Sequence, residues 1–434
     1  MSEANNLIVN NSKPLIGNIQ IPGDKSISHR SIILGALCKG DLHIQNFLNS
    51  DDCLATVNAM RQLGVDISLD GDEVFIKGKG LSGLEEPTSI INAGNSGTLM
   101  RLLTGILSTQ TFNSAITGDN SLKSRPMARI IKPLTSIGAK IESNNYKAPI
   151  KIFSPGTLSP INYEQDIASA QVKSCLVLAS LFINKESIFY EKIPTRDHTE
   201  NLLEHLGYKI ERDKNFFRLM GSQPLIANNI IIGSDISSAS FFIVAALIVK
   251  GSNLKLDNIN INKYRTGILT VLKDMGADIR VSNIKKISNE SVADIEVRYS
   301  NLKPANVSGD VIPSLIDELP ILFIACAITP GISKISGIEE LRHKESDRIK
   351  AMEDGLRSIG INVSSTNNSI QITGGKILGG KVDSCSDHRI AMSFAIAGLV
   401  SESSITITDT KNIATSFPSF VSILKSQGVE IFEV

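Results

Sequence analysis

The feature of this sequence that most restricts its fold is an internal repeat that occurs six times. Six segments share the pattern of an amphipathic helix that ends at a glycine and runs into a short strand. They are DDCLATVNAMRQLGVDI, RPMARIIKPLTSIGAKI, DHTENLLEHLGYKI, YRTGILTVLKDMGADI, DRIKAMEDGLRSIGINV and PSFVSILKSQGVEI. Their glycines are Gly64, Gly138, Gly207, Gly276, Gly360 and Gly428, at spacings of 74, 69, 69, 84 and 68 residues. Such a period predicts one supersecondary unit used six times, with each glycine as a left-handed helix C-cap.

Each repeat also contains an earlier helical segment, which is small and polar at its start and then apolar throughout. These segments are DKSISHRSIILGAL, NSGTLMRLLTGIL, SAQVKSCLVLASLF, DISSASFFIVAALIV, DELPILFIACAI and SDHRIAMSFAIAGLV, starting near Asp24, Asn95, Ser169, Asp235, Asp317 and Ser386. A helix that is apolar on every side is expected to be buried. Stretches such as VDISLD and EVFIKG alternate with period two, as strands do. Each repeat is therefore predicted to be strand, buried helix, strand, surface helix and two further strands.

Length and charge limit the organisation and the possible partners. A chain of 434 residues is too long for one ordinary core, so we expect two domains of three repeats each. Lys plus Arg equals Asp plus Glu at 44 each, so no global field favours nucleic acid or an anionic membrane. The longest apolar stretches, residues 241–249 and 321–328, are far shorter than the ~20 residues that span a bilayer. Any anion site must be built locally.

Cysteine usage and the first residues indicate the compartment. The five cysteines are scattered, with no CxxC or metal-ligand spacing, which favours a reducing compartment. Residues 1–12 contain no basic segment followed by an apolar run, so we expect no secretory signal. The sequence predicts a cytoplasmic protein.

The starts of the buried helices are candidates for an anion site. If three such helices run parallel in each domain, their N-termini meet, and their free N–H groups and dipoles would attract an anion. The pattern alone leaves open that they are capped core helices without a ligand.

Cations stand at these helix starts, although a cation there opposes the helix dipole unless an anion is present. Those of the buried helices are Lys25, Arg30, Arg101, Lys173 and Arg389, and those at surface-helix starts are Arg125, Arg196, Lys344 and Arg348. Their recurrence at equivalent positions predicts a ligand with several negative charges. The GDKS segment lacks the spacing of a Walker A motif.

Seven ordered motifs carry a resemblance to a known family. GDKSISHR, NSGTLMR, SAQVKS, LIDELP, LRHKESDR, SDHRIAMSF and IATSFP span more than 390 residues. They resemble the successive signatures of the 5-enolpyruvylshikimate-3-phosphate synthases. The resemblance implies an α/β (α+β) fold, a two-domain inverse α/β barrel in which each domain has three βαβαββ repeats, with parallel buried helices and strands outside. By analogy, residues 22–235 form one domain and residues 1–21 plus 236–434 the other, with the active site in the cleft between them.

The resemblance also implies an activity. The family transfers the enolpyruvyl group of phosphoenolpyruvate to the 5-hydroxyl of shikimate 3-phosphate and releases phosphate, by addition–elimination through a tetrahedral intermediate in aromatic amino acid biosynthesis. This implies two small-molecule substrates, no metal or organic cofactor, no nucleic acid or membrane partner, and a monomer. Glyphosate, which mimics phosphoenolpyruvate, is an implied inhibitor.

Residue roles follow from the matched motifs. Asp317 matches the aspartate that accepts the hydroxyl proton, Glu345 matches the acid that protonates the methylene carbon, and Lys25 matches the lysine that reaches both substrates. The residues that match shikimate 3-phosphate contacts are Lys25, Ser26, Arg30, Ser169, Ala170, Gln171, Arg196, Asp317 and Lys344. The residues that match phosphoenolpyruvate contacts are Lys25, Gly97, Arg125, Gln171, Arg348 and Arg389. Arg101 and His388 are expected to support the site, and Lys173 to be either support or solvated surface.

Some positions depart from the common family pattern. Thr415 stands where many members have a lysine, and Glu340 aligns with an asparagine that contacts shikimate in some members. With Ala170 and the RDHTE segment, these departures resemble a divergent subgroup, class II, whose members are often less sensitive to glyphosate. We therefore expect reduced sensitivity, although Gly97 in place of alanine leaves room for the inhibitor.

Two alternative functions remain to be tested. An enolpyruvyl transferase acting on UDP-N-acetylglucosamine shares the fold but usually has a reactive cysteine in a loop whose counterpart here, TGDNSLKSRP, has none. A non-catalytic anion-binding repeat protein is disfavoured by the zero net charge and by Asp317 and Glu345 beside the cations. Loss of turnover with retained binding in an Asp317→Ala variant would distinguish enzyme from binder.

Overall fold

The chain divides into two compact units, each with its own hydrophobic core. The structure is a computed structural model that describes residues 6–165 and 168–434. The first unit comprises the described residues of Met1–Pro22 together with Ser234–Lys285 and Ser291–Val434. The second unit comprises the described residues of Gly23–Gly233 and the short segment Lys286–Glu290.

The second unit contains three repeats in chain order. The first has α1 (Lys25–Ala36), β3 (Cys38–Gln45), α2 (Asp51–Gln62), β4 (Asp66–Asp70) and β5 (Glu73–Lys79). The next has β6 (Ile91–Asn92), α3 (Gly97–Leu107), β7 (Ser114–Thr117), α4 (Asn120–Ser124), α5 (Ala128–Ser136), β8 (Lys140–Asn144) and β9 (Lys147–Phe153). The last has β10 (Asn162–Glu164), α6 (Ala170–Ser180), β11 (Glu186–Tyr190), α7 (His198–His205), β12 (Glu211–Arg212) and β13 (Phe216–Met220), followed by β14 (Leu225–Ile226) and β15 (Ile230–Ile231).

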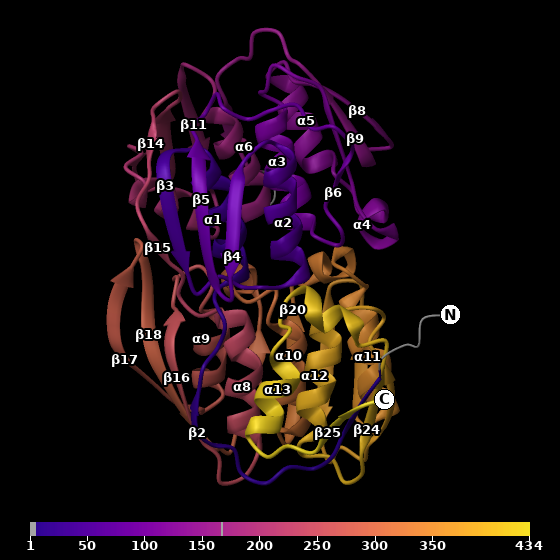
Figure 1. Cartoon of the computed structure of the whole chain (residues 1–434). Helices are drawn as coiled ribbons and strands as arrows, with labels where there is room; N and C mark the ends of the chain where they lie inside the picture. The colour runs from indigo at the N-terminus through magenta and orange to yellow at the C-terminus, as the bar shows by residue number, and fades with distance from the viewer. Residues whose placement is uncertain (1–5, 166–167) are drawn as a thin grey trace. The chain divides into compact units, whose positions relative to one another are not determined.

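The first unit contains the other three repeats (Figure 1). After β1 (Leu7–Val9) and β2 (Ile16–Ile19) come α8 (Ile236–Ile248), β16 (Asn253–Asn260), α9 (Gly267–Asp274), β17 (Asp278–Ile287) and β18 (Glu290–Arg298). The next repeat has β19 (Asn306–Val307), η1 (Gly309–Ser314), α10 (Leu319–Ile328), β20 (Gly331–Ser336), η2 (Glu339–His343), α11 (Arg348–Ser358), β21 (Asn362–Ser365) and β22 (Ser369–Gly374). The last has β23 (Gly380–Asp383), α12 (His388–Gly398), β24 (Ile405–Thr408), η3 (Lys411–Thr415), α13 (Phe420–Ser426) and β25 (Ile431–Glu433).

Each repeat forms one sheet, and the sheets share one topology. In the order β6-β7-β9-β8, the first pair is parallel and the other pairs are antiparallel. The repeat at the start of the second unit has no leading strand of its own, and β14 and β15 pair with β3 in parallel to replace it. In the first unit, β2 pairs in parallel with β16, and β1 lies between β24 and β25. Strands distant in sequence therefore complete three of the six sheets.

The six glycines occupy the predicted cap positions. Helices α2, α5, α7, α9, α11 and α13 each end two residues before the glycine of their repeat. All six glycines have positive φ, from +78° at Gly207 to +106° at Gly138. A side chain would be strained in this conformation, so glycine ends each helix and turns the chain toward the next strand. The prediction of surface helices that end at glycine is confirmed.

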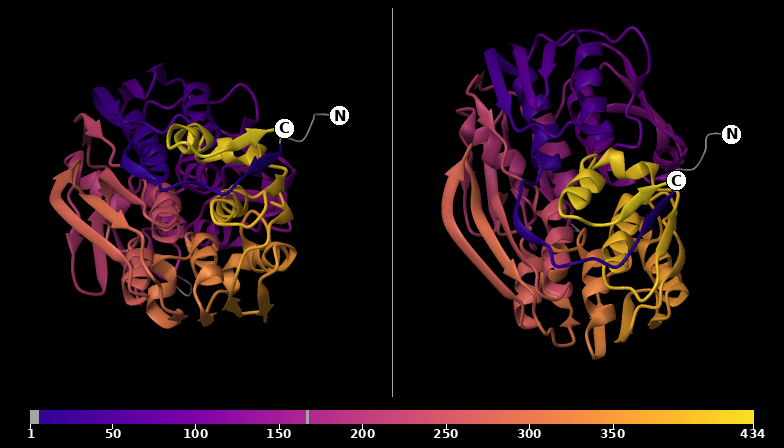
Figure 2. Two further views of the ribbon diagram at one scale, coloured as in Figure 1. Left: turned by 90° about the horizontal axis from the view of Figure 1, so that it is seen from below. Right: turned by 60° about the horizontal axis from the view of Figure 1, so that its bottom comes forward.

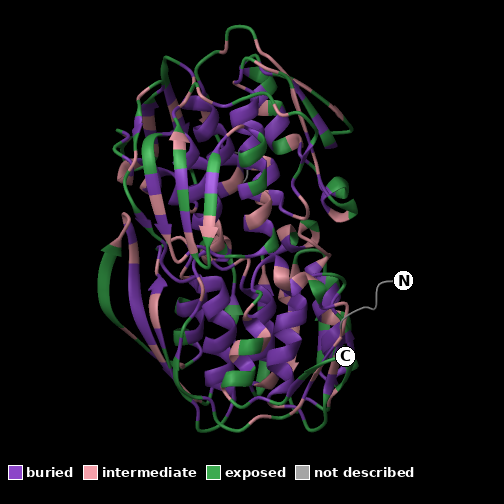
Figure 3. Cartoon of the chain, viewed as in Figure 1, coloured by how far each residue is buried: buried purple, intermediate pink, exposed green. Residues whose placement is uncertain are grey.

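The six apolar segments form the buried helices α1, α3, α6, α8, α10 and α12, as predicted (Figure 3). Three of them start one residue later than expected, because Ser96, Glu318 and Asp387 are the N-caps rather than their predecessors. In the view along the helices of the first unit, strands such as β17 and β18 lie at the periphery (Figure 2). Within the described part of the chain, no helix combines the length and apolarity needed to cross a bilayer. The predicted α/β fold with strands outside buried helices is confirmed.

Candidate active site

The starts of the three buried helices of the second unit lie together. Arg30 in α1 donates a hydrogen bond from Nη2 to Ser174 Oγ in α6 (2.7 Å). Gln171 at the start of α6 donates from Nε2 to Thr98 Oγ1 at the start of α3 (3.0 Å). Because these contacts join first or second turns, the three helices start at one face of the unit. This is the arrangement that favours anions.

Lys25 and Arg30 in α1 are held by polar partners. The Lys25 ammonium lies 2.5 Å from the carboxylate of Asp52 in α2. Arg30 is 3% exposed and donates from Nε to Thr199 Oγ1 (2.7 Å) and from Nη1 to the Ser26 carbonyl (2.8 Å). Burial and the nearby Arg196 lower the pKa of Arg30 to about 10, so the guanidinium stays charged near neutral pH. The structure thus brings Lys25, Ser26, Arg30 and Arg196 into one region.

Gly97 allows two arginines to approach the start of α3. Arg101 donates from Nη1 to the Gly97 carbonyl (3.3 Å) and to Gln171 Oε1 (2.5 Å). Arg125 donates from Nη2 to Asn95 Oδ1 (2.8 Å). A Cβ atom on residue 97 would lie 2.8 Å from Arg101 Nη1 and 3.3 Å from Arg125 Nη1. A Cβ at this position would therefore oblige the ends of both arginine side chains to shift.

The start of α6 carries the predicted phosphate-binding turn. Ser169 is the N-cap, and its Oγ accepts a hydrogen bond from Val172 N (3.4 Å). A hydroxyl that accepts one hydrogen bond can still donate another. Ala170 is the first residue of the helix and is buried. This turn can present a hydroxyl and backbone N–H groups to a phosphate.

Lys173 is a buried supporting residue rather than solvated surface. Its Nζ lies 2.7 Å from Glu200 and 2.9 Å from Glu191, and donates to the Thr195 carbonyl (3.2 Å). Burial lowers the pKa of this ammonium, but the two carboxylates outweigh that effect and raise it. Lys173 therefore stays charged and fixes the segment that carries Arg196.

The starts of the three buried helices of the first unit also lie together. Arg389 in α12 donates from Nη1 to the Asp317 carbonyl (2.8 Å) and lies 3.7 Å from Glu318, the N-cap of α10. The hydroxyl of Ser237 in α8 donates to the Glu318 carboxylate and accepts from the buried Arg265 (2.5 Å). Both units thus repeat the same convergence of helix starts.

The predicted acid and base lie in one cluster of charges in the first unit. Lys344 Nζ is 3.1 Å from Asp317 Oδ1, and Arg348 Nη1 is 3.8 Å from the same oxygen. Arg348 also contacts Glu345 Oε2 (2.5 Å) and Asp387 Oδ2 (2.7 Å). The structure therefore brings together Asp317, Lys344, Glu345 and Arg348, and the Asp317 carbonyl adds Arg389 to them.

Asp387 holds Arg348 in place and was missed as a functional candidate. Burial and Glu345 raise the pKa of Asp387, but Arg348, together with His388, outweighs them and lowers it. Burial lowers the pKa of Arg348, but Asp387 and Glu345 have a larger effect in the opposite direction. The net shift of the Arg348 pKa is therefore upward. A signal was present, since this carboxylate follows the expected start Ser386 and directly precedes His388 and Arg389. His388 is buried beside it, as expected of a supporting residue.

Other supporting residues had no local signal. Asp52 lies 27 positions from its partner Lys25, and Glu191 and Glu200 are known as partners of Lys173 only from the fold.

Thr415 is buried in η3, with its hydroxyl donating to Asn412 O (2.7 Å). No group of three or more potential metal-ligating side chains occurs in residues 6–165 and 168–434.

The fold and the two clusters define a class of protein. Related repeats in both units present cations at helix starts, and one cluster adds two carboxylates suited to proton transfer. Such an arrangement is suited to anionic ligands and has the groups for acid–base chemistry on them.

Comparisons with known proteins identify the family. The chain matches the family model described as EPSP synthase (3-phosphoshikimate 1-carboxyvinyltransferase) over residues 9–424. It is 45% identical over 422 residues to a 3-phosphoshikimate 1-carboxyvinyltransferase of Coxiella burnetii, covering 97% of this chain and 96% of that protein. It is 47% identical over 426 residues to one of Legionella pneumophila, covering 97% and 98%. The solved EPSP synthase structure from Acinetobacter baumannii matches with a TM-score of 0.88 and 44% identity, covering 99% of this chain and all of that one. The chain belongs to the EPSP synthase family.

Proposed function

We propose that this chain transfers the enolpyruvyl group of phosphoenolpyruvate to the 5-hydroxyl of shikimate 3-phosphate and releases inorganic phosphate. Full-length similarity to proteins named for this reaction supports the proposal. The observation that carries it is the cluster of Asp317, Lys344, Glu345 and Arg348, in which the assigned proton acceptor lies beside Lys344 and Arg348 and the assigned proton donor contacts Arg348.

The chemistry needs two proton transfers, and two carboxyl groups are assigned to them. Asp317 accepts the proton of the 5-hydroxyl of shikimate 3-phosphate while the hydroxyl oxygen attacks C2 of phosphoenolpyruvate. Glu345, whose carboxylate contacts Arg348 in the chain without substrate, has to take up a proton before this step. It then donates that proton to the methylene carbon, which becomes a methyl group in the tetrahedral intermediate. Glu345, now a carboxylate, then takes a methyl proton back as the C–O bond to phosphate breaks, which restores the double bond in the product. The proton accepted by Asp317 leaves with the phosphate. Lys344, 3.1 Å from Asp317, stabilises that carboxylate.

Cations and N–H donors are assigned to the substrates. We assign Arg30 to the shikimate ring and its carboxylate, since a guanidinium suits bidentate binding of a carboxylate. The phosphate of shikimate 3-phosphate is assigned to Ser169, Ala170 and Arg196. The remaining contacts of shikimate 3-phosphate are assigned to Lys25, Ser26, Gln171, Asp317 and Lys344. Those of phosphoenolpyruvate are assigned to Lys25, Gly97, Arg125, Gln171, Arg348 and Arg389.

We also propose the setting of the reaction. The two compact units are taken as the two domains of the family, which jointly supply residues for the one reaction. We further propose that the protein acts in the cytoplasm as a monomer, without a metal or an organic cofactor.

Phosphate release tests the function directly. We expect inorganic phosphate to appear when the protein is mixed with shikimate 3-phosphate and phosphoenolpyruvate, and not when either substrate is omitted. UDP-N-acetylglucosamine in place of shikimate 3-phosphate is expected to give no release. Release with UDP-N-acetylglucosamine alone as acceptor, or tight binding of both substrates without release, would contradict the proposal.

Reduced sensitivity to glyphosate is a further prediction, based on Thr415, Glu340 and the RDHTE segment. We expect glyphosate to compete with phosphoenolpyruvate only well above low micromolar concentrations. Initial rates measured at several concentrations of each compound give the inhibition constant. Competition at low micromolar concentration would show that Gly97 leaves enough room for the inhibitor and that the class II expectation is wrong.

A further inference from the structure

The tip of the β17–β18 hairpin is part of the second unit, although the strands on both sides belong to the first. Asn289 donates from Nδ2 to the Asn201 carbonyl (3.2 Å) and to Glu204 Oε2 (3.1 Å) in α7. Ser288 Oγ accepts a hydrogen bond from Ile231 N (2.8 Å). The tip is therefore fixed against the helix that follows Arg196.

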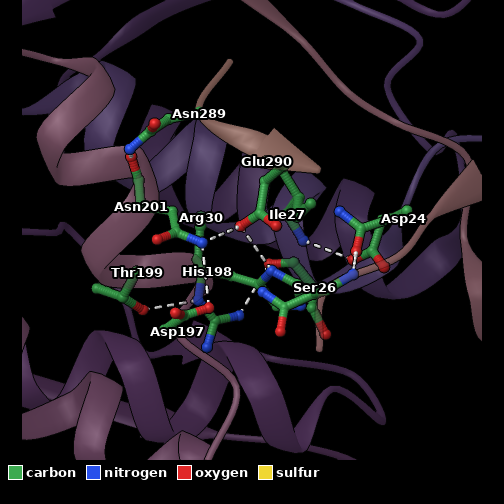
Figure 4. A network of polar contacts seen from close by, with 12 residues as sticks. Asp24, Ser26, Ile27, Arg30, Asp197, His198, Thr199, Asn201, Asn289 and Glu290 are labelled. Atoms are coloured by element: carbon green, nitrogen blue, oxygen red, sulfur yellow. Dashed lines mark hydrogen bonds and ion pairs between the residues drawn. The ribbon is translucent and has the colours of Figure 1, made fainter. Parts of the chain in front are cut away.

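Glu290 is the buried charge of this tip. It is 4% exposed, and its Oε1 is 2.8 Å from His198 Nδ1 and 3.1 Å from Asn201 Nδ2 (Figure 4). Because a carboxylate accepts, Nδ1 of His198 carries the proton in this contact. Burying a carboxylate is costly unless it is paired, and an apolar residue could dock a hairpin without that cost. Packing of the hairpin alone therefore does not explain why a carboxylate is present at this position.

The first turn of α7 connects Glu290 to two of the cations assigned to shikimate 3-phosphate. His198, which contacts Glu290, is followed by Thr199, whose Oγ1 accepts from Arg30 Nε (2.7 Å) and donates to Ser174 Oγ (2.7 Å). Arg196 lies two residues before His198. Figure 4 shows Arg30, Thr199, His198 and Glu290 in one polar network. Movement of this turn would displace both arginines.

Electrostatics acts in the same direction as the geometry. Burial lowers the pKa of Arg30 most, and the like charge of Arg196 lowers it further. Glu200, Asp24 and Glu290 oppose these effects. A carboxylate near two mutually repelling cations reduces the free-energy cost of keeping them close while no substrate is bound.

We propose that Glu290 is a positioning residue for shikimate 3-phosphate, acting through His198 and the start of α7 on Arg30 and Arg196. The inference rests on the proposed function, because it assigns those two arginines to that substrate. It adds a residue from outside the seven motifs to the site.

The test separates the two substrates. In Glu290→Ala we expect the KM for shikimate 3-phosphate to rise about tenfold, the size of the loss of one charge-assisted hydrogen bond. The KM for phosphoenolpyruvate and kcat should stay within about twofold. Glu290→Gln keeps an oxygen that can accept from His198, so most of the affinity should return. Calorimetric titration with shikimate 3-phosphate alone should show the same loss of affinity.

Controls distinguish positioning from folding. Glu296→Ala removes a half-exposed glutamate of the same strand, whose partner is Arg298, and should leave both KM values unchanged. Asn289→Ala weakens docking of the tip without removing the carboxylate, and should have a smaller effect on the KM for shikimate 3-phosphate than Glu290→Ala. Combined with His198→Ala, Glu290→Ala should add little, because the two residues act in series.

Several outcomes would overturn the inference. An active wild-type protein whose Glu290→Ala variant keeps its KM for shikimate 3-phosphate would exclude the positioning role. Equal rises in both KM values in Glu290→Ala would indicate a purely structural role for Glu290. An equal rise in the KM for shikimate 3-phosphate in Asn289→Ala would indicate the same. A wild-type protein that neither binds shikimate 3-phosphate nor releases phosphate would instead refute the proposed function.

Discussion

Replacing Asp317 with alanine is expected to lower kcat for phosphate release by about 10²–10⁴-fold, the usual contribution of a positioned general base. In the structure, Asp317 is half-buried, with Lys344 Nζ 3.1 Å from its Oδ1 and Arg348 Nη1 3.8 Å from the same atom. Both cations remain in the variant, so the anionic substrates should still bind. Steady-state kinetics with both substrates, together with calorimetric titration of shikimate 3-phosphate, measure the two effects separately.

A matched control for this variant is available nearby. Asp310 is an exposed aspartate in η1, which precedes α10 as Asp317 does. Asp310→Ala should keep kcat within about twofold, because an exposed side chain away from the cluster contributes little. If Asp317→Ala kept full turnover, the assignment of the base would be wrong, and a non-catalytic role for the cluster would gain support.

Replacing Arg348 with methionine is expected to lower the free energy of unfolding by about 3–5 kcal/mol, the usual cost of removing one partner of a buried ion pair. Arg348 is 1% exposed and contacts Asp387 and Glu345, at 2.7 and 2.5 Å. Methionine fills similar space but leaves these carboxylates without their cation. Urea unfolding followed by circular dichroism measures the difference. The same variant should also lose affinity for phosphoenolpyruvate.

The stability difference should depend on pH in a defined direction. Arg348 holds the pKa of Asp387 below its ordinary value of about 3.9, so this pair stabilises the fold above that pH. As pH falls through the lowered pKa, Asp387 becomes protonated and the contribution is lost. The difference in the free energy of unfolding between wild type and Arg348→Met should therefore become smaller below about pH 4. Arg357→Met removes an exposed arginine of the same helix and should change stability by no more than about 0.5 kcal/mol. An equal difference in the free energy of unfolding between wild type and Arg348→Met at pH 7 and pH 3 would contradict the proposed contribution of the Arg348–Asp387 ion pair.

The local parts of the fold could be predicted because each depends on a short stretch of sequence. An apolar helix must be buried, and a glycine after the last apolar turn can adopt positive φ, as Gly64 and Gly428 do. Cations at equivalent helix starts also indicated which residues would come together, as Arg389 and Asp317 do. These inferences need no knowledge of distant contacts.

The parts that could not be predicted depend on pairing across long separations. Strands β14 and β15 complete the sheet of β3, and β1 lies between β24 and β25, but none of these short strands carries a register signal. Lys173 and Glu290 are ordinary charged residues in the sequence, and only the fold shows that both are buried beside their partners. The start of α10 was assigned one residue early because Asp317 is the stronger N-cap by type, whereas Glu318 occupies the position.

A structure of the protein with shikimate 3-phosphate and phosphoenolpyruvate, or with glyphosate in place of the latter, tests the central claim most directly. The claim is that cations at converging helix starts exist to bind the two anionic substrates. We predict contacts from Arg30, Ser169 and Arg196 to shikimate 3-phosphate, and from Arg125, Arg348 and Arg389 to phosphoenolpyruvate or its mimic. Substrates bound elsewhere, with these cations still contacting only their partners within the chain, would contradict it.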